Sequence, residues 1–358
     1  MVVGTRERNH RRMARVVVTG AASPLGTRVA ARLLERADVE AVVAIDLLPA
    51  GVAGADVHQL DLVTADLGPS FAGADSVIHL ASVFGPAIEG PEIEEAVEVA
   101  MARRVLDAAE AVGATRIVLS STATVYGPWA NNPVPLTEEA PLRPHPELAY
   151  AVQMAEIERI TADWSADRPD VTVARLRPAP VVRDGALGWL ARMLDAAADV
   201  PTGDDTAAQY LHVDDLASAV VASWAAGLDG PVNVAPDRWL TPTERRALDP
   251  VPRLRLPEPV ALKVAGWRWR LRLAPVPPGI LPYARHPWVV ANDRLLATGW
   301  TASQSNEEAY VAGHEASAIE SISPQRRQEL ALGLLGGVVA AGVAGGVALV
   351  RRKRRRSA

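Results

Sequence analysis

Short runs of β-branched residues alternate along this chain with longer stretches of helical spacing, and this alternation constrains the fold more than any other feature. It is typical of βαβ units. Several of the runs are apolar on both faces, as buried parallel strands are. The sequence therefore predicts an α/β fold built on a doubly wound parallel sheet. The expected strands are 16–19, 42–46, 57–62, 77–81, 117–121 and 171–176, and the expected helices are 24–36, 92–112 and 147–167.

Charge and composition exclude several classes of function. The 358 residues carry a formal net charge of -5, which argues against a nucleic-acid binder. No cysteine is present and the histidines lack metal-ligand spacing, so no metal site is predicted. His79 and His212 fall inside strand motifs and are expected in the core. Lysine occurs only at Lys263 and Lys353, so nothing before residue 263 can offer an ammonium group.

The segment Thr19–Gly26 joins the first expected strand to the first expected helix. Phosphates bind backbone N–H groups at a helix N-terminus, where the helix dipole also favours anions. Gly20 permits a tight turn, and Gly26 permits close packing of helix and strand. Ser23 stands where a third glycine is usual, and its hydroxyl could donate to a pyrophosphate oxygen. The turn therefore predicts a dinucleotide site.

Two aspartates strengthen this prediction. Asp46 ends the second expected strand, about twenty positions after the turn, where a carboxylate accepts both ribose hydroxyls of NAD. The same carboxylate repels the 2′-phosphate of NADP, so we expect NAD. Asp61 follows the third expected strand and is placed to face the adenine amino group. The alternative for Asp46 is a solvated side chain at a strand end.

Further motifs follow in a recognisable order: Val77–Ala81, Ser120–Gly127, Tyr150 opening a helix that contains Glu158, Arg177-Pro178, Leu211–Ala217 and Asn233–Ala235. Together with the turn and the two aspartates, they resemble the extended short-chain dehydrogenases/reductases, the NAD-dependent epimerase/dehydratase family, which acts mostly on nucleotide sugars. The match covers about residues 14–318. It implies a Rossmann fold, NAD as cofactor, a small-molecule substrate such as a nucleotide sugar, and a homodimer as one possible assembly. The cofactor residues expected are Gly20, Ser23, Pro24, Leu25, Gly26, Asp46, Asp61, Leu62, Leu80, Ala81, Tyr150 and Pro178.

The resemblance also implies a catalytic pair. The residues at the positions of Thr122 and Tyr150 polarise a substrate hydroxyl or carbonyl in that family, and the tyrosine acts as general base or acid while hydride passes to or from the nicotinamide. A lysine four residues after the tyrosine lowers its pKa there. A helix puts positions i and i+4 on one face. Here that position is Met154, which carries no charge and donates no hydrogen bond.

Two other positions depart from the family. Its asparagine on the helix after the fourth strand, which orders the lysine through water, is replaced by Glu98. The stretch Ala179–Val182 after Arg-Pro has no amide side chain. A free tyrosine has a pKa of about 10, a nearby cation moves a pKa by about 1–3 units, and general base catalysis is worth about 10²–10⁴ in rate. Without the lysine, we expect much of this rate factor to be lost. An arginine such as Arg143 or Arg159 is the remaining candidate for a nearby cation.

Two hypotheses of function follow. The first is an NAD-dependent oxidoreductase, epimerase or dehydratase acting on a nucleotide sugar or a related hydroxyl or carbonyl compound through Thr122 and Tyr150. The second is a non-catalytic NAD(H)-binding sensor or scaffold at the membrane, which Met154, Glu98 and the basic tail favour.

The C-terminal part differs in kind. Leu330–Val350 contains only Leu, Ala, Gly and Val, and six cations follow. As a helix it would span roughly 30 Å, about one hydrocarbon core. We expect this helix to attach a cytoplasmic protein to the membrane, either by spanning the bilayer or by lying at its lipid interface. The alternative is a weakly hydrophobic helix that never inserts. The expected organisation is a disordered leader (1–13), an NAD-binding core (14–177), a substrate lobe with returning core elements (178–318), a linker (319–329), a membrane helix (330–350) and a basic tail (351–358).

Overall fold

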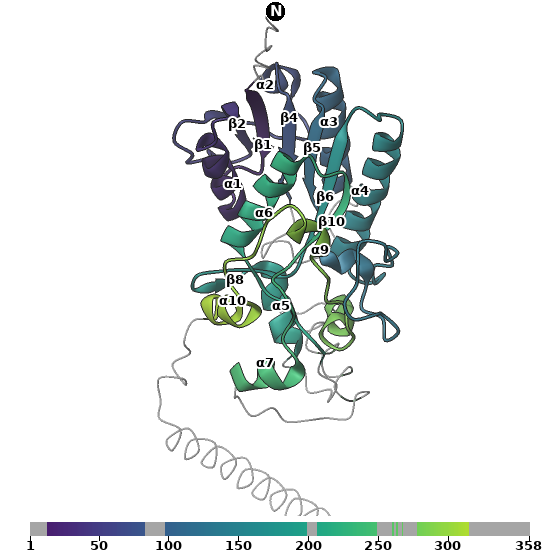
Figure 1. The fold of residues 1–358 in the computed structure, drawn as a ribbon. Helices are drawn as coiled ribbons and strands as arrows, with labels where there is room; N and C mark the ends of the chain where they lie inside the picture. The colour runs from purple at the N-terminus through teal and green to yellow at the C-terminus, as the bar shows by residue number, and fades with distance from the viewer. Residues whose placement is uncertain are drawn as a thin grey trace, which may run out of the picture. The chain divides into compact units, whose positions relative to one another are not determined.

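The computed structural model describes residues 13–82, 97–198, 206–248, 260, 263, 267 and 278–314. These residues form a seven-stranded sheet in the order β10-β6-β5-β4-β1-β2-β3, with every pair of neighbours parallel (Figure 1). The predicted α/β fold with a doubly wound parallel sheet is confirmed. The strands are β1 (Ala14–Thr19), β2 (Val39–Asp46), β3 (Asp56–Gln59), β4 (Ser76–His79), β5 (Arg116–Ser120), β6 (Thr172–Pro178) and β10 (Gly230–Val234).

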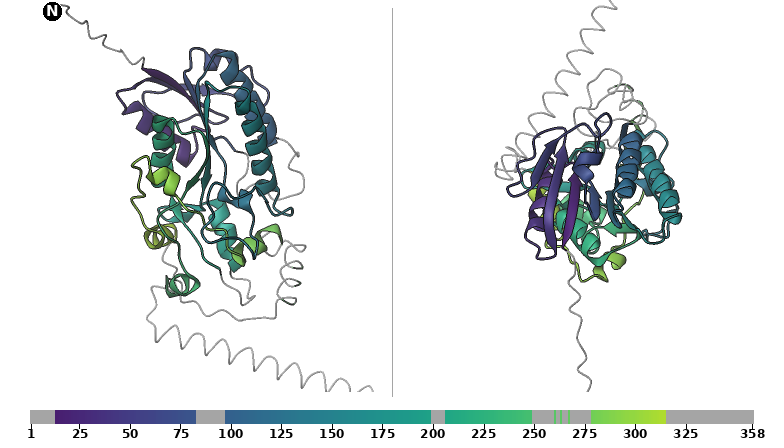
Figure 2. Two further views of the ribbon diagram at one scale, coloured as in Figure 1. Left: turned by 45° about the vertical axis from the view of Figure 1, so that its right-hand side comes forward. Right: turned by 90° about the horizontal axis from the view of Figure 1, so that it is seen from above.

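Helices cover both faces of this sheet. Helices α1 and α6 contact each other on one face, and α3 and α4 contact each other on the opposite face (Figure 2). The helices are α1 (Pro24–Leu34), α2 (Gly68–Phe71), α3 (Val97–Ala111), α4 (Ala149–Ala166), α5 (Trp189–Ala198), α6 (Val213–Ala226), α7 (Pro242–Leu248), α9 (Asp293–Leu296) and α10 (Asn306–Gly313), with 3₁₀ turns η1 (Ala123–Tyr126) and η2 (Pro278–Ala284).

The central strand β1 shows why its sequence is apolar at successive positions. Val16, Val17 and Val18 are all fully buried. Val16 and Val18 pack with the α1 and α6 side of the core, whereas Val17 packs with the α2 and α3 side. Successive side chains point to opposite faces of a strand, so a strand covered on both faces needs apolar residues throughout.

The strand order reverses between β1 and β4. From β1 the chain runs outward through β2 and β3, and β4, β5, β6 and β10 build the other half. In open α/β sheets, ligands bind at the carboxyl ends of the strands beside such a reversal. The ends of β1 and β4, at Thr19 and His79, therefore mark the expected binding crevice.

A smaller lobe follows β6 at the carboxyl ends of the strands (Figure 1). It contains a short sheet in the order β8-β7-β9, with β7 (Val181–Arg183), β8 (Ala186–Leu187) and β9 (Leu211–His212). The chain then returns to the large sheet, where α6 packs on one face and β10 pairs with β6.

Several predicted segments lie outside the described residues. These are nearly all of the leader (1–13), the linker (319–329), the membrane helix (330–350) and the basic tail (351–358). Membrane association therefore stays a prediction. Within the described ranges, no helix has both the length and the apolar character needed to cross a bilayer.

Candidate cofactor and catalytic site

The turn between β1 and α1 can be built only with glycine at two positions. Gly20 has a φ of +73°, and a Cβ there would lie 2.6 Å from the amide nitrogen of Ala81. A Cβ at Gly26 would overlap the carbonyl oxygen of Gly20. Glycine tolerates both the left-handed conformation and the close approach of backbone. The turn thus brings the start of α1 against the residues that follow β4.

Ser23 caps α1 instead of standing free. Its hydroxyl donates to the Gly20 carbonyl at 2.7 Å and accepts from the Gly26 N–H at 2.9 Å. The Ser23 hydroxyl hydrogen is therefore already bonded inside the turn. In this arrangement the hydroxyl cannot also make the predicted donation to a pyrophosphate oxygen. Pro24 has no N–H to donate. The backbone N–H of Leu25 has no partner within the described part of the chain, so it is the donor that the turn leaves for an anion.

Asp46 ends β2 beside this turn. Its Oδ2 accepts the Ala22 N–H at 2.9 Å, and its Oδ1 accepts the Leu48 N–H at 3.1 Å. The side chain is half-buried and each carboxylate oxygen can accept a second hydrogen bond. The residue therefore fixes the turn and keeps capacity for hydroxyl donors, as the sequence predicted for a ribose.

Asp61 lies beyond β3 and forms a local turn. Its Oδ1 accepts the Val63 N–H at 2.9 Å, and its Oδ2 accepts the Thr64 hydroxyl at 2.8 Å. These hydrogen bonds lower the pKa of the carboxyl. They also end the strand early: β3 stops at Gln59, whereas the sequence predicted a strand to Leu62, which is buried instead.

A buried histidine joins the ends of β1 and β4. His79 Nδ1 lies 2.7 Å from the hydroxyl of Thr19, and burial lowers the pKa of His79 to about 4. His79 and His212 are 5% and 1% exposed, which confirms that both are core histidines. Leu80, which is buried, and Ala81, which is partly buried, continue from β4 into the crevice. Pro178 ends β6, in the half of the sheet that β4, β5, β6 and β10 build.

The two predicted catalytic residues lie together. Thr122 is the residue before η1, and its hydroxyl accepts the Thr124 N–H at 3.2 Å. Tyr150 lies in the first turn of α4, hydrogen-bonds to the Thr122 side chain, and meets the ring of Trp189 edge-on at 4.7 Å between centroids. The structure brings these two residues together, although 28 positions of the chain separate them; their catalytic role stays a prediction.

A cavity of about 40 Å³ adjoins Tyr150 where the family lysine would lie. Met154, 4% exposed, and Glu98, 1% exposed, line it together with Tyr150. The Ser82 hydroxyl donates to Glu98 Oε1 at 2.7 Å. Among the described lining residues there is no lysine or arginine. The volume holds a few water molecules at most.

The arginines considered as substitutes for the lysine are used elsewhere. Arg143 donates to Asn132 Oδ1 at 2.9 Å, and Arg159 pairs with Glu156 on the surface. The structure therefore rules out both as lining groups of this cavity. Burial and the negative charge of Glu98 raise the pKa of Tyr150 well above its usual value, while the Thr122 hydrogen bond opposes that shift. Tyr150 is protonated at neutral pH in this arrangement.

Comparisons with known proteins agree with this geometry. The model of the NAD dependent epimerase/dehydratase family matches residues 16–235. The chain belongs to this family. The family that the sequence motifs resemble is thereby confirmed, a family whose description names NAD and epimerase/dehydratase chemistry.

Individual relatives of this family member are distant. An uncharacterised protein of Mycobacterium tuberculosis is 30% identical over 234 residues, which are 62% of this chain and 62% of that protein. A UDP-glucose 4-epimerase of Corynebacterium glutamicum is 29% identical over 238 residues, 58% of this chain and 70% of the relative. The crystal structure of the Thermus thermophilus UDP-glucose 4-epimerase in complex with NAD has a TM-score of 0.61 at 22% identity, covering 84% of this chain and 97% of that one.

A buried ionic network, which the sequence did not reveal, supports the segment of this family member that begins at Thr122. Arg177 on β6 and Glu158 on α4 are 4% and 1% exposed and form a close pair. The Ser121 hydroxyl donates to Glu158 Oε1 at 2.6 Å, and Arg177 Nη1 donates to the Tyr126 hydroxyl at 2.7 Å. Ser121 and Tyr126 flank the segment that begins with Thr122. The network thus holds that segment from both ends.

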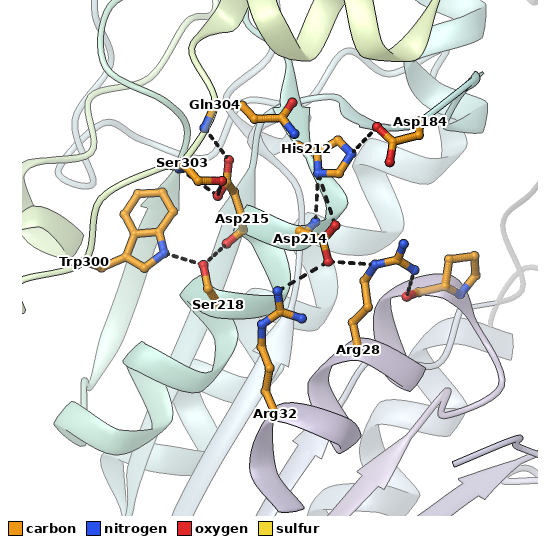
Figure 3. A network of polar contacts seen from close by, with 11 residues as sticks. Arg28, Arg32, Asp184, His212, Asp214, Asp215, Ser218, Trp300, Ser303 and Gln304 are labelled. Carbon is orange, nitrogen blue, oxygen red and sulfur yellow. Dashed lines mark hydrogen bonds and ion pairs between the residues drawn. The ribbon is translucent and has the colours of Figure 1, made fainter. Parts of the chain in front are cut away.

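A second network joins helix α1, helix α6 and the segment before α10 (Figure 3). Asp214, at the start of α6, accepts Arg28 Nε at 2.9 Å and Arg32 Nη2 at 3.3 Å, both from α1. The neighbouring Asp215 accepts the Ser303 hydroxyl at 2.7 Å and the Gln304 N–H at 3.1 Å. Adjacent carboxylates of one helix turn therefore connect α1 to the segment that leads into α10.

Proposed function

We propose that this chain is an NAD-dependent oxidoreductase of the epimerase/dehydratase type, acting on a nucleotide sugar or a related hydroxyl or carbonyl compound. The proximity of the Tyr150 and Thr122 hydroxyl groups carries the proposal, because it places two polar groups together beside the crevice. A substrate oxygen at that point would be polarised by both groups.

The residues around the glycine turn would hold NAD. Gly20 and Gly26 clear space for a pyrophosphate, the Leu25 N–H would donate to it, and Asp46 would accept the adenosine ribose hydroxyls. Asp61 and Leu62 would face the adenine, and Leu80, Ala81, Tyr150 and Pro178 would surround the nicotinamide half. When bound, NAD supplies the hydride donor or acceptor.

The state of Tyr150 favours one direction of chemistry. The raised pKa keeps its hydroxyl protonated, so Tyr150 acts as a hydrogen-bond and proton donor rather than as a base. Donation to a carbonyl oxygen assists reduction, because negative charge develops on that oxygen as hydride arrives. Thr122 orients the phenol and shares the same oxygen. We therefore propose that carbonyl reduction is faster than alcohol oxidation near neutral pH.

A second candidate function is non-catalytic NAD(H) binding, as a sensor or scaffold. The observation that favours it is the cavity beside Tyr150, where a thioether and a buried carboxylate stand in place of the family's ammonium. The dinucleotide side keeps its glycines and Asp46, so binding without turnover is consistent with the same geometry. Membrane attachment of either form, and a homodimer, stay predictions.

The test separates the two candidates. The full chain is incubated with NAD and UDP-glucose or UDP-galactose, or with NADH and an aryl aldehyde, and both nicotinamide absorbance and sugar interconversion are followed. Turnover that Tyr150→Phe lowers by about 10²-fold or more supports the oxidoreductase. Tyr310→Phe, a buried tyrosine on α10, serves as the control and should keep full activity. Turnover that Tyr150→Phe leaves unchanged overturns the assignment, and NAD binding without turnover supports the second candidate.

A further inference from the structure

The small lobe contains a second cavity with an unusual lining. A cavity of about 30 Å³, partly open to solvent, lies between η2, α5 and the segment leading into β9. Its wall is mostly apolar or aromatic: Ala123, Ala179, Pro180, Leu194, Trp288 and Val289 contribute to it. Ala123 directly follows Thr122, and α5 also carries the Trp189 that packs on Tyr150. The cavity therefore begins beside the proposed catalytic pair.

Most polar side chains of this lining are already used by the protein. Gln209 donates to the carbonyls of Arg238 and Val290 and accepts the Val290 N–H. The Tyr283 hydroxyl donates to the Thr124 carbonyl at 2.8 Å, and the Trp288 indole donates to the Tyr283 carbonyl at 2.8 Å. These groups fix the walls and offer little to a polar ligand.

Arg245 is the charged residue among the described lining residues. This residue of α7 lines the cavity, is 8% exposed, and its Nη2 is buried without a hydrogen-bond partner in the described part of the chain. The neighbouring Glu244 does not serve it, because its carboxylate accepts the Thr241 N–H at 2.8 Å. A buried guanidinium N–H group without a hydrogen-bond partner costs free energy. A cation held in that way beside a cavity is suited to meet an anion there.

We propose that the substrate of this site is an apolar carboxylate, whose carboxyl group binds Arg245 while its hydrocarbon or aryl body lies against the apolar wall of this open cavity. This inference rests on the proposed oxidoreductase function and names its substrate class. One guanidinium matches one carboxylate in charge. A nucleoside diphosphate carries more charge and needs polar contacts for its base, which the described lining does not supply.

The test uses 3-phenylpropanoate, its neutral isostere 3-phenylpropanamide and UDP-glucose as probes, with binding to the full chain measured by calorimetry in the presence of NAD. We expect the acid to bind about ten- to a hundredfold more tightly than the amide, the range of a hydrogen bond to a charged group. Arg245→Met should abolish that preference and Arg245→Lys should keep part of it. Arg246→Met, the exposed neighbour on the same helix, is the matched control and should leave it intact.

Three results would overturn the proposal: equal affinity for acid and amide in the unaltered protein, no detectable binding of the acid, or tighter binding of UDP-glucose that Arg245→Met does not change. The comparison of acid with amide needs no variant, so it stands even if a substitution impairs folding. Failure of the oxidoreductase function has a different signature. It would leave the protein without NAD-dependent thermal stabilisation or Tyr150-dependent turnover, whatever Arg245 binds.

Discussion

Met154 lies one helical turn after Tyr150 on α4, and both side chains line the cavity that also contains the buried carboxyl group of Glu98. An ammonium at the methionine position would stabilise the phenolate of Tyr150. The carboxylate does the opposite, and with burial it raises the pKa of the phenol. The electrostatics at the proposed reacting group are thus reversed in sign relative to those that the family resemblance implies.

Met154→Lys should reverse this effect. The added ammonium, next to Glu98 and Tyr150, is expected to lower the pKa of the phenol and to speed alcohol oxidation near neutral pH by about 10–100-fold. The pH profile of kcat for oxidation should move to lower pH. Met154→Gln, which adds polarity without charge, is the control. An unchanged profile in Met154→Lys would contradict the electrostatic account of Tyr150.

Asp46 should decide between the two dinucleotides. NAD should raise the melting temperature of the unaltered protein and NADP should not; a ligand at one hundred times its Kd adds about 2.7 kcal/mol. Asp46→Asn keeps an acceptor for the Ala22 N–H but removes the charge, so the discrimination against NADP should shrink. Asp56→Asn, an exposed aspartate on β3, should change neither response. Stabilisation by NADP alone would contradict the choice of cofactor.

The fold was predictable because its signals are local. The uninterrupted apolar run of β1 reflects burial on both faces. Gly20 and Gly26 stand where the backbone of neighbouring residues leaves no space for a Cβ atom. The predicted end of a strand was wrong where a side chain competes with strand pairing for hydrogen bonds. The strand ends at Gln59, short of the predicted Leu62, because Asp61 accepts the Val63 N–H and the Thr64 hydroxyl and forms a local turn.

The site was predictable only in part. Tyr150 and Thr122 could be found because they stand in recognisable motifs, and Met154 because helix periodicity fixes its face. The role of Arg245 could not be found, since nothing in the sequence around α7 shows that its guanidinium is buried beside a cavity. The internal bonds of Ser23 escaped prediction because a hydroxyl can serve a ligand or its own turn equally well.

His79 should make stability depend on pH. The folded protein protonates this imidazole only near pH 4, whereas an unfolded chain does so near pH 6.5. Between these values the unfolded state binds more protons, so the free energy of unfolding should fall as pH falls from 6.5 to 4, by up to about 3 kcal/mol. Urea denaturation across this range should show a flatter dependence for His79→Gln. His286→Gln, at a partly exposed site, should keep the original slope.

The pair formed by Glu158 and Arg177 should be costly to break from one side. Glu158→Gln leaves the guanidinium buried without its counter-charge, and such losses cost about 3–5 kcal/mol. Glu156→Gln breaks the exposed pair with Arg159 on the same helix, whose partners are about half exposed, and should cost less than about 1 kcal/mol. Chemical denaturation of the two variants measures the difference.

Replacing both partners of the buried pair separates charge from packing. With Glu158→Met and Arg177→Met together, no uncompensated charge remains, so stability should recover part of the loss seen for Glu158→Gln. Activity should not recover with it, because Ser121 and Tyr126 would lose the partners that hold the segment beginning at Thr122. A double variant that regains turnover as well as stability would show that the network serves only the fold.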